Sequence, residues 1–158
     1  MRTKRAKKRK DIIVAVSGGF DPLHIGHVRL FERAKKLGDK LVVILNNDNW
    51  LMTKKGHVFM KEQERKEVIQ ALRAVGRVVI TAHKTNDLDA SVCRELARIR
   101  PDIFANGGDR RNENDIPETV VCKKLGIRMM FNVGKGGKVQ SSSWLLQKYS
   151  KRLAPREK

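Results

Sequence analysis

Two histidines stand one helical turn apart in the stretch Gly18-Gly19-Phe20-Asp21-Pro22-Leu23-His24-Ile25-Gly26-His27. The stretch follows an apolar run, residues 12–16, and precedes an amphipathic segment, so it connects a strand to a helix. A Gly pair lets the backbone approach a phosphate closely, and a helix N-terminus offers free N–H groups. Because two imidazoles can also hydrogen-bond phosphoryl oxygens, the pattern predicts an enzyme that acts on a nucleoside triphosphate.

The alternative is a strand-to-helix turn with two incidental histidines. The chain has only four histidines, His24, His27, His57 and His83, and two of them share one His-x-Gly-His arrangement after a Gly-Gly turn. Motif and structural context agree, which favours the phosphate-binding interpretation.

Short apolar runs alternate with segments of helical periodicity along the chain, which is typical of a parallel sheet covered on both faces. We therefore expect an α/β fold: a single Rossmann-like, doubly wound domain with a five-stranded parallel sheet. The expected strands are residues 12–16, 40–45, 77–81, 102–105 and 128–132, and the expected helices are residues 28–37, 62–75, 88–98, 117–125 and 141–149.

Polar loops follow the strands rather than the helices, at residues 18–27, 46–60, after Thr81, 106–114 and 133–143. In a doubly wound sheet the ligand lies beyond the carboxyl ends of the strands. The sequence therefore predicts one site built from several separate loops.

The 158 residues fit one domain, and the formal net charge is +18. Seven Lys and Arg side chains lie within residues 1–10, which we expect to be a disordered basic arm. The arm either contacts a polyanion such as RNA or anionic lipid or serves only as a solvated end. Residues 11–150 are expected to form the catalytic domain and residues 151–158 a flexible basic tail.

No apolar stretch approaches the roughly 20 residues of a membrane span, and residues 1–10 lack the apolar region of a signal peptide. We therefore expect a cytoplasmic protein. Cys93 and Cys122 have no short-spaced partner, so neither a zinc site nor a disulfide framework is indicated. Both are expected to pack as small apolar side chains within helices.

Several motifs together resemble the cytidylyltransferase-like nucleotidyltransferases over about residues 12–146. The motifs are Gly-x-Phe-Asp-x-x-His-x-Gly-His, the Lys54-Lys55 loop, the Glu64-Arg65 pair, the Gly107-Gly108-Asp109 turn and the Ser141-Ser142-Ser143 helix start. The group includes glycerol-phosphate and ethanolamine-phosphate cytidylyltransferases, the adenylyltransferase unit of ADP-heptose synthase, and archaeal FAD synthase.

Within the group, Pro101-Asp102, the turn that begins at Asn106 and Asp115-Ile116 are most similar to the heptose-phosphate adenylyltransferases. The cytidylyltransferases usually carry an Arg-Thr-x-Gly-Ile-Ser motif before the final helix, where this chain has Gly-Gly-Lys-Val-Gln-Ser at residues 136–141. The missing Arg argues against CTP, but Lys135 or Lys138 could supply the same charge, so ATP and CTP both stay open. Relatives also commonly carry Asp where this chain has Gly76.

The resemblance implies that an acceptor phosphate attacks the α-phosphorus of the triphosphate and displaces pyrophosphate. Since that phosphate is already anionic near neutral pH, the protein must align two anions and stabilise charge rather than supply a base. Mg²⁺ is expected as the cofactor because it neutralises the triphosphate, with unknown protein ligands. By resemblance alone we also expect a homodimer.

The expected acceptor is a sugar or polyol phosphate, with a heptose phosphate first. A CTP-dependent enzyme for glycerol phosphate or an amino-alcohol phosphate is one alternative, and an RNA-binding protein that uses the basic arm is another. A fragment of a class I aminoacyl-tRNA synthetase shares the His-Ile-Gly-His motif, but no Lys-Met-Ser-Lys-Ser sequence follows here.

Residue roles carry over from matching positions. His24, His27 and one of Lys54 and Lys55 are expected to act on the triphosphate. Asp21 and Arg65 are assigned to the acceptor, with metal binding left open for Asp21. The nucleotide-binding residues are expected to be Gly18, Gly19, Phe20, Arg73, Gly108, Asp109, Ser141, Ser142 and Ser143. Arg65 and Arg73 fall on nearly the same face of the helix expected over residues 62–75.

Overall fold

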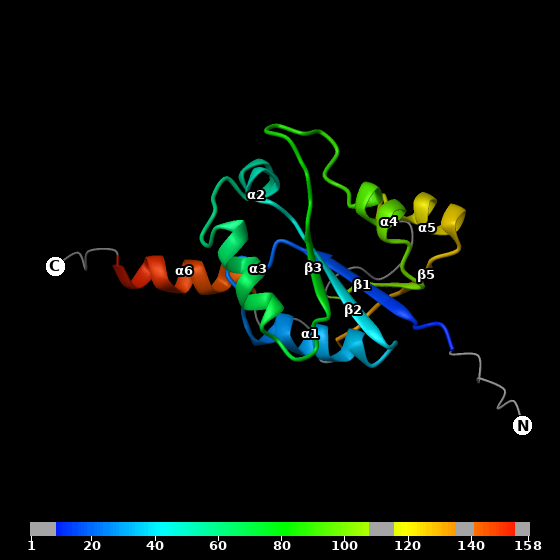
Figure 1. Cartoon of the computed structure of the whole chain (residues 1–158). Coiled ribbons are helices and arrows are strands. Elements are labelled where there is room, and N and C mark those ends of the chain that lie inside the picture. Colours follow the sequence, from blue (N-terminus) through cyan, green and yellow to red (C-terminus); the bar gives the residue numbers. More distant parts are fainter. Residues whose placement is uncertain (1–8, 108–115, 135–140, 154–158) are drawn as a thin grey trace, which may run out of the picture.

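The computed structural model describes residues 9–107, 116–134 and 141–153 (Figure 1). One parallel sheet has the strand order β3-β2-β1-β4-β5. Its strands are β1 (Ile13–Gly18), β2 (Lys40–Leu45), β3 (Arg77–Ile80), β4 (Ile103–Ala105) and β5 (Arg128–Met130). The chain winds outward from β1 to β3 and then returns to the other side of β1, which confirms the doubly wound five-stranded fold. The switch in strand order lies between β1 and β4.

Helices cover both faces of the sheet (Figure 1). The helices are α1 (Ile25–Lys35), α2 (Asp48–Lys55), α3 (Glu62–Gln70), α4 (Cys93–Ile99), α5 (Thr119–Leu125) and α6 (Ser142–Leu153). Phe31 of α1 and Ile69 of α3 join the core on one face, while Leu96 of α4 and Cys122 of α5 join the core on the other. The last helix, α6, extends away from the sheet. None of the described helices is long and apolar enough to cross a membrane.

Several boundaries near the site differ from the expectation. The helix expected over residues 28–37 is α1, Ile25–Lys35, which already includes His27. Strand β1 runs through Gly18, because Ser17 and Gly18 continue the parallel pairing with β2. Residues 48–55, expected as a loop, form α2, whose first turn is capped by Asn47 through a 3.0 Å hydrogen bond from the Trp50 N–H to Asn47 Oδ1. The Asn-rich start of this segment is therefore a helix cap rather than a turn.

The helix expected over residues 62–75 ends earlier, at Gln70, with Ala71 as its C-cap. Arg73 therefore does not continue the face of α3 that carries Arg65. The helix expected from residue 88 begins only at Cys93, since the carboxylates of Asp87 and Asp89 bind backbone N–H groups and form turns before it.

Helix α6 reaches Leu153, so the first residues of the expected tail are helical. The expected arm lies outside the described residues up to residue 8, and Gly108 and Asp109 lie outside them too. Cys122 is buried and Cys93 half-buried, each within a helix, and both thiols are free.

Candidate active site

The turn after β1 has no room for side chains at its two glycines. A Cβ at Gly18 would lie 2.8 Å from the Phe20 ring, and a Cβ at Gly19 would lie 2.8 Å from Leu51 Cδ2 of α2. Phe20 itself adopts a positive φ of 48° and is buried. The chain therefore turns tightly, with bare backbone at the carboxyl edge of the sheet.

The ring of Phe20 packs against the ring of His27. Its ring meets the rings of His27 and Phe31 edge to face, each at 5.0 Å between centroids. The ring of Phe20 is buried, so the geometry favours a supporting role for Phe20, and its expected contact with the nucleotide stays a prediction.

His24 and His27 together form the N-terminal cap of α1. The Gly26 N–H donates to His24 Nδ1 at 3.1 Å, and the His24 N–H donates to His27 Nδ1 at 3.3 Å. The two rings are stacked, with centroids 3.7 Å apart and planes 23° apart. This is a capping box in which two imidazoles stand where Ser or Thr and Glu or Gln are usual.

The capping bonds fix which ring nitrogen carries the proton. Since each Nδ1 accepts from a backbone N–H, each neutral ring holds its proton on Nε2, which is then a hydrogen-bond donor. Burial, the neighbouring His24 ring and Lys55 lower the pKa of His27 to about 3. Burial and the charge of Lys55 also lower the pKa of His24. At neutral pH both rings are therefore neutral donors beside a helix N-terminus.

Lys54 and Lys55 lie in the last turn of α2 rather than in a loop. Lys55 is the member of the pair whose positive charge acts on both imidazoles. The pKa of Lys55 is itself lowered, mainly by partial burial of the ammonium and also by Arg65, while the carboxylate of Asp21 opposes the change. Helix α2 thus brings one cation to the His-x-Gly-His turn.

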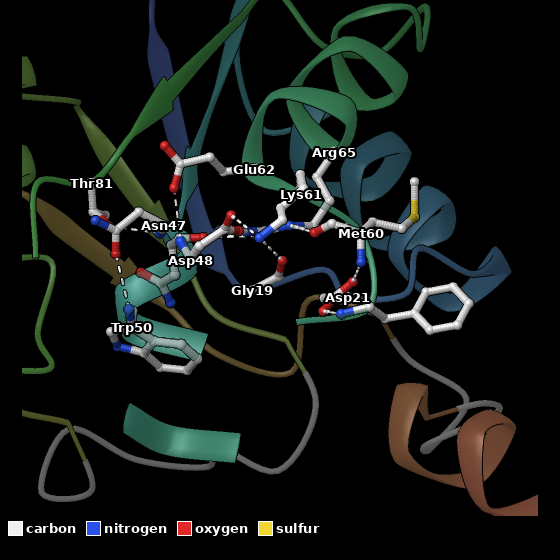
Figure 2. A network of polar contacts seen from close by, with 12 residues as sticks. Gly19, Asp21, Asn47, Asp48, Trp50, Met60, Lys61, Glu62, Arg65 and Thr81 are labelled. Carbon is white, nitrogen blue, oxygen red and sulfur yellow. Dashed lines mark hydrogen bonds and ion pairs between the residues drawn. The ribbon is translucent and has the colours of Figure 1, made fainter. Parts of the chain in front are cut away.

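Arg65 is fully buried at the centre of a polar network (Figure 2). Its guanidinium donates to the carbonyls of Gly19 at 2.7 Å and Asn46 at 2.8 Å, and it forms an ion pair with Asp48 at 2.7 Å. Its Nε donates to the Met60 carbonyl at 2.8 Å. Arg65 therefore joins the turn after β1, the end of β2, the start of α2 and the segment before α3.

Asp21 is also buried, with 1% of its surface exposed. Its carboxylate accepts from the Phe59 N–H at 2.7 Å and from the Met60 N–H at 2.8 Å. Asp21 and Arg65, both assigned to the acceptor from the sequence, are thus engaged with the backbone of this chain. The geometry favours a supporting role for both residues.

The start of α6 lies against the same turn. The Ser142 hydroxyl donates to the Pro22 carbonyl at 2.9 Å, and both Ser141 and Ser142 are buried, while Ser143 is exposed. This contact brings the N-terminus of α6 to within two residues of His24 along the chain. The N-termini of α1 and α6 therefore both lie near the segment that leads from Pro22 to His24, and each helix N-terminus favours a bound anion.

Gly107, two residues after the end of β4, lies where there is no room for a side chain. A Cβ there would lie 2.8 Å from Leu30 Cδ1 of α1 and 3.1 Å from the Val133 carbonyl. The backbone after β4 therefore lies close to the backbone after β5 and to a side chain of α1 at the switch point. Gly108 and Asp109, the next two expected residues, lie outside the described part of the chain.

Arg73 lines a cavity that runs along α1. Lys35 and Lys36 line it near the C-terminal end of the helix, and Val28, the residue that follows His27, lines it as well. The expected shared helix face of Arg65 and Arg73 assumed a longer α3, and the end of that helix at Gln70 overturns it. The nucleotide-binding role expected for Arg73 stays a prediction.

A polar cluster beyond β3 had no assigned role in the sequence. The Asn47 N–H donates to Thr81 Oγ1 at 3.0 Å, and the side-chain amides of Asn47 and Asn49 donate to the His83 carbonyl at 2.8 and 2.9 Å. The buried His83 ring lies between Thr81 Oγ1 and the Ser91 carbonyl. The cluster fixes α2, and hence Lys55, against the sheet. Its only sequence signal is the run of Asn residues after β2.

Asp21, for which metal binding was left open, is buried, and each of its oxygens accepts one backbone N–H group, which favours a structural role. In the described part of the chain, no three His, Cys, Asp or Glu side chains are arranged to hold a metal ion. Any Mg²⁺ in this site would be held mainly by substrate phosphates and water.

Comparison with known proteins places these features in a family. Residues 15–143 match the cytidylyltransferase-like family model. FAD synthase from Thermococcus kodakarensis is 39% identical over 105 residues, which are 66% of this chain and 67% of that protein. The bifunctional protein HldE from Syntrophotalea carbinolica is 38% identical over 122 residues, but these are only 22% of that protein.

Solved structures agree. A lipopolysaccharide core biosynthesis protein from Thermoplasma volcanium superposes with a TM-score of 0.61 and 28% identity, over 78% of this chain and 95% of that one. Pantothenate synthetase from Thermus thermophilus, at 14% identity and a TM-score of 0.51, shares the fold alone. The family, the fold and the two-histidine turn confirm what the motifs predicted: this chain belongs to the cytidylyltransferase-like nucleotidyltransferases.

Proposed function

We propose that this protein transfers the adenylyl group of ATP to a phosphate monoester and releases pyrophosphate. The observation that carries the proposal is the pair of Nε2–H donors of His24 and His27, whose Nδ1 atoms accept backbone N–H groups, at the N-terminus of α1 beside Lys55. Neutral hydrogen-bond donors and one cation suit a reaction between two phosphate anions, because the acceptor phosphate is already ionised and needs no general base.

The reaction needs alignment and charge stabilisation. An oxygen of the acceptor phosphate forms a bond to the α-phosphorus, and the bond from that phosphorus to the bridging oxygen breaks as pyrophosphate leaves. The two imidazoles donate hydrogen bonds to phosphoryl oxygens, and the ammonium of Lys55 balances charge on the leaving group. Bound Mg²⁺ would neutralise part of the triphosphate charge. The buried network around Arg65 holds Gly19 and α2 in place for this contact.

ATP is the nucleotide that two independent observations support. The chain lacks the Arg-Thr-x-Gly-Ile-Ser motif of the cytidylyltransferases. Its relatives FAD synthase and HldE also both support an adenylyl transfer.

A sugar phosphate is the first acceptor that we propose. The resemblance to the adenylyltransferase unit of ADP-heptose synthase supports it, as does the match to a lipopolysaccharide core biosynthesis protein over 95% of that chain.

An aromatic phosphate monoester, such as flavin mononucleotide, is the second candidate. Phe59 is 58% exposed and Trp144 is 46% exposed. Phe59 donates its N–H to Asp21, and Ser142, two residues before Trp144, binds the Pro22 carbonyl. Two exposed aromatic side chains thus flank the Asp21-Pro22 segment that leads into His24, where a planar ring would find stacking partners. The similarity to FAD synthase supports the same acceptor.

Pyrophosphate release tests the proposal. The purified protein is given Mg²⁺ with ATP or CTP against heptose and hexose phosphates, glycerol phosphate, ethanolamine phosphate and flavin mononucleotide. Release that needs both ATP and one acceptor, and that is lost in a His24→Ala, His27→Ala variant of unchanged far-UV circular dichroism, is the expected result. Release only with CTP, or none with any pair, would overturn it.

A further inference from the structure

Basic side chains gather at the amino edge of the sheet, at the other end of the strands from the His-x-Gly-His turn. The strands of the sheet pair in parallel, so their amino ends share one edge, about 20 Å along β1 from the turn. On the half of this edge that β1, β4 and β5 form, we define a basic edge by its exposed cations: Lys10, Arg98, Arg100, Lys124 and Arg128.

Hydrogen bonds around Asp102 bring three of these positions together. The Asp102 N–H donates to the Ile13 carbonyl at 2.8 Å, and the Asp102 carbonyl accepts from the Arg128 N–H at 3.0 Å. The Asp102 carboxylate accepts from the Ile13 N–H at 2.8 Å and lies 3.5 Å from Lys10 Nζ. Arg100 comes two residues before Asp102. The segments that begin β1, β4 and β5 therefore carry cations at neighbouring positions.

Helices α4 and α5 bring two more cations to this edge. Each helix runs back from the carboxyl edge to the start of the next strand, and Arg98 and Lys124 lie in their last turns. Cations there also offset the partial negative charge of a helix C-terminus, but that charge is only about half a unit per helix. Lys10 and Arg128 lie at strand starts, where strand dipoles are small. The edge therefore keeps an excess of positive charge.

Little of this charge is neutralised by carboxylates. Among the residues that the structure describes, only Lys10 of the basic edge forms an ion pair. The Lys10 side chain is 85% exposed in that pair, and such surface pairs contribute little. Residues 9–12 lead into β1 at this edge, and residues 1–8 before them include five more Lys and Arg (Figure 1).

The composition of the basic edge favours nucleic acid over a membrane. None of the large apolar side chains that are exposed in the described residues belongs to it, and Val120 lies in the first turn of α5, at the end away from Lys124. A helix or patch that inserts into a lipid surface needs such side chains. The bases of a single strand also need exposed aromatic rings for stacking. A duplex needs only phosphate contacts, and it presents one phosphate per 1.7 Å of its axis, roughly.

We propose that the basic edge binds the phosphate backbone of duplex nucleic acid without reading its base sequence. Arg98, Arg100 and Arg128 offer paired N–H donors to phosphate oxygens, and the two lysines add point charges. The Lys and Arg side chains of residues 1–8 add further attraction for the same duplex. Since the basic edge and the His-x-Gly-His turn lie at opposite ends of the strands, the duplex and ATP bind at the same time.

Fluorescence anisotropy with a labelled RNA duplex of about 24 base pairs tests the proposal on the full chain, at about 50 to 200 mM NaCl. The edge variant replaces three exposed cations: Arg98→Ala, Lys124→Ala and Arg128→Ala. The matched control removes the same charge from exposed positions on α6, which extends away from the sheet: Lys148→Ala, Lys151→Ala and Arg152→Ala. Far-UV circular dichroism checks that both variants are folded.

We expect the edge variant to bind the duplex at least about tenfold more weakly at 100 mM salt, because phosphate contacts dominate the affinity. The slope of log affinity against log salt concentration should also become shallower by about 2 to 3, since each lost contact contributes about 0.9. The α6 control, and the unaltered protein with excess Mg²⁺ and ATP, should keep their affinity within about twofold.

Equal losses in the two triple variants would overturn the proposal, because net charge alone would then explain the binding. Displacement of the duplex by ATP would overturn it by assigning the nucleic acid to the catalytic site. Tighter binding of single-stranded RNA of the same length would contradict the duplex as partner. Binding to vesicles of phosphatidylserine and phosphatidylcholine, without binding to the duplex, would identify a membrane instead. Because no turnover is measured, these outcomes are independent of the catalytic proposal.

Discussion

Asp21 and Arg65 bind the two ends of one residue, Met60. The Met60 N–H donates to the Asp21 carboxylate at 2.8 Å, and the Met60 carbonyl accepts from Arg65 Nε at 2.8 Å (Figure 2). The turn after β1 and helix α3 are therefore joined through the segment that follows α2. Asp21 and Arg65, which the sequence assigned to the acceptor, hold together the backbone segments that surround the site.

Arg65→Met is expected to lower the free energy of unfolding by about 3 to 5 kcal/mol, because it leaves buried carbonyls and the Asp48 carboxylate without their donor. The melting temperature would fall by roughly 10 °C. Thermal and urea unfolding measure the change. Arg98→Met, on the exposed side of α4, is the control, with an expected change under about 0.5 kcal/mol. Equal losses in both variants would contradict the role of the network.

Asp21→Asn separates support from substrate binding. An amide can accept from only one of the two backbone N–H groups of Phe59 and Met60, so the variant should lose about 1.5 to 3 kcal/mol of stability without any ligand present. Urea unfolding of the free protein measures this loss. Unchanged stability with a raised KM for the acceptor would instead show that Asp21 binds substrate directly.

The free energy of unfolding should decrease as the pH is lowered, because of His27. The pKa of its folded-state ring is about 3, whereas an unfolded His titrates near 6.5. Between these values the unfolded state binds the extra proton, so stability is complete above pH 6.5 and is lost as the pH falls toward 3. From pH 7.5 to pH 5 the loss due to His27 is up to about 2 kcal/mol.

His27→Gln isolates this effect, since Gln at the same helix position can still accept from the His24 N–H. Urea unfolding at the two pH values should show a smaller loss for the variant than for the unaltered protein. Identical losses would mean that the His27 ring titrates as freely in the folded protein as in the unfolded chain.

Lys54 and Lys55 should differ in their effect on catalysis. Lys55→Met removes the charge that acts on both imidazoles, and the loss of one such contact lowers kcat by about 10² to 10³-fold. Lys54→Met is expected to change kcat/KM less than about threefold, as for an exposed charge outside the site. Steady-state pyrophosphate release compares the two. A larger loss in Lys54→Met would assign the role to the other lysine.

Phe59→Ala and Trp144→Ala distinguish the two acceptors. If the acceptor carries a planar ring, each variant should raise its KM by about two- to tenfold through lost stacking, with the KM for ATP unchanged. Leu88→Ala removes a fully exposed apolar side chain from the loop before α4 and serves as the control. A sugar phosphate as acceptor predicts no difference among the three variants.

The sequence was sufficient for the sheet and for the central turn. The five strands follow from short, branched apolar runs, and the His-x-Gly-His spacing places both imidazoles on one helix turn. Helix α2 was missed because its cap, Asn47, stands in a polar run that also suits a loop. The buried state of Arg65 could not be foreseen, since its partners are mostly backbone carbonyls from separate elements, which leave no side-chain pattern.

Arg73 shows the reverse error. Apolar periodicity continues past Gln70, so the pattern predicts a longer helix, but the chain turns at Ala71 to bring Val75 into the core ahead of β3. A shift of a few residues in one helix end therefore takes Arg73 off the helix face that carries Arg65.

The capping box of α1 also bears on how such a protein can change over time. His24 and His27 hold the first turn of the helix and present the reactive donors with the same two rings. Asn or Ser at the first position and Gln or Glu at the second would preserve the cap while removing the Nε2–H groups. Descendants that have lost the chemistry can therefore keep the architecture intact, and an ordinary capping box after the Gly-Gly turn would be the mark of such a pseudoenzyme.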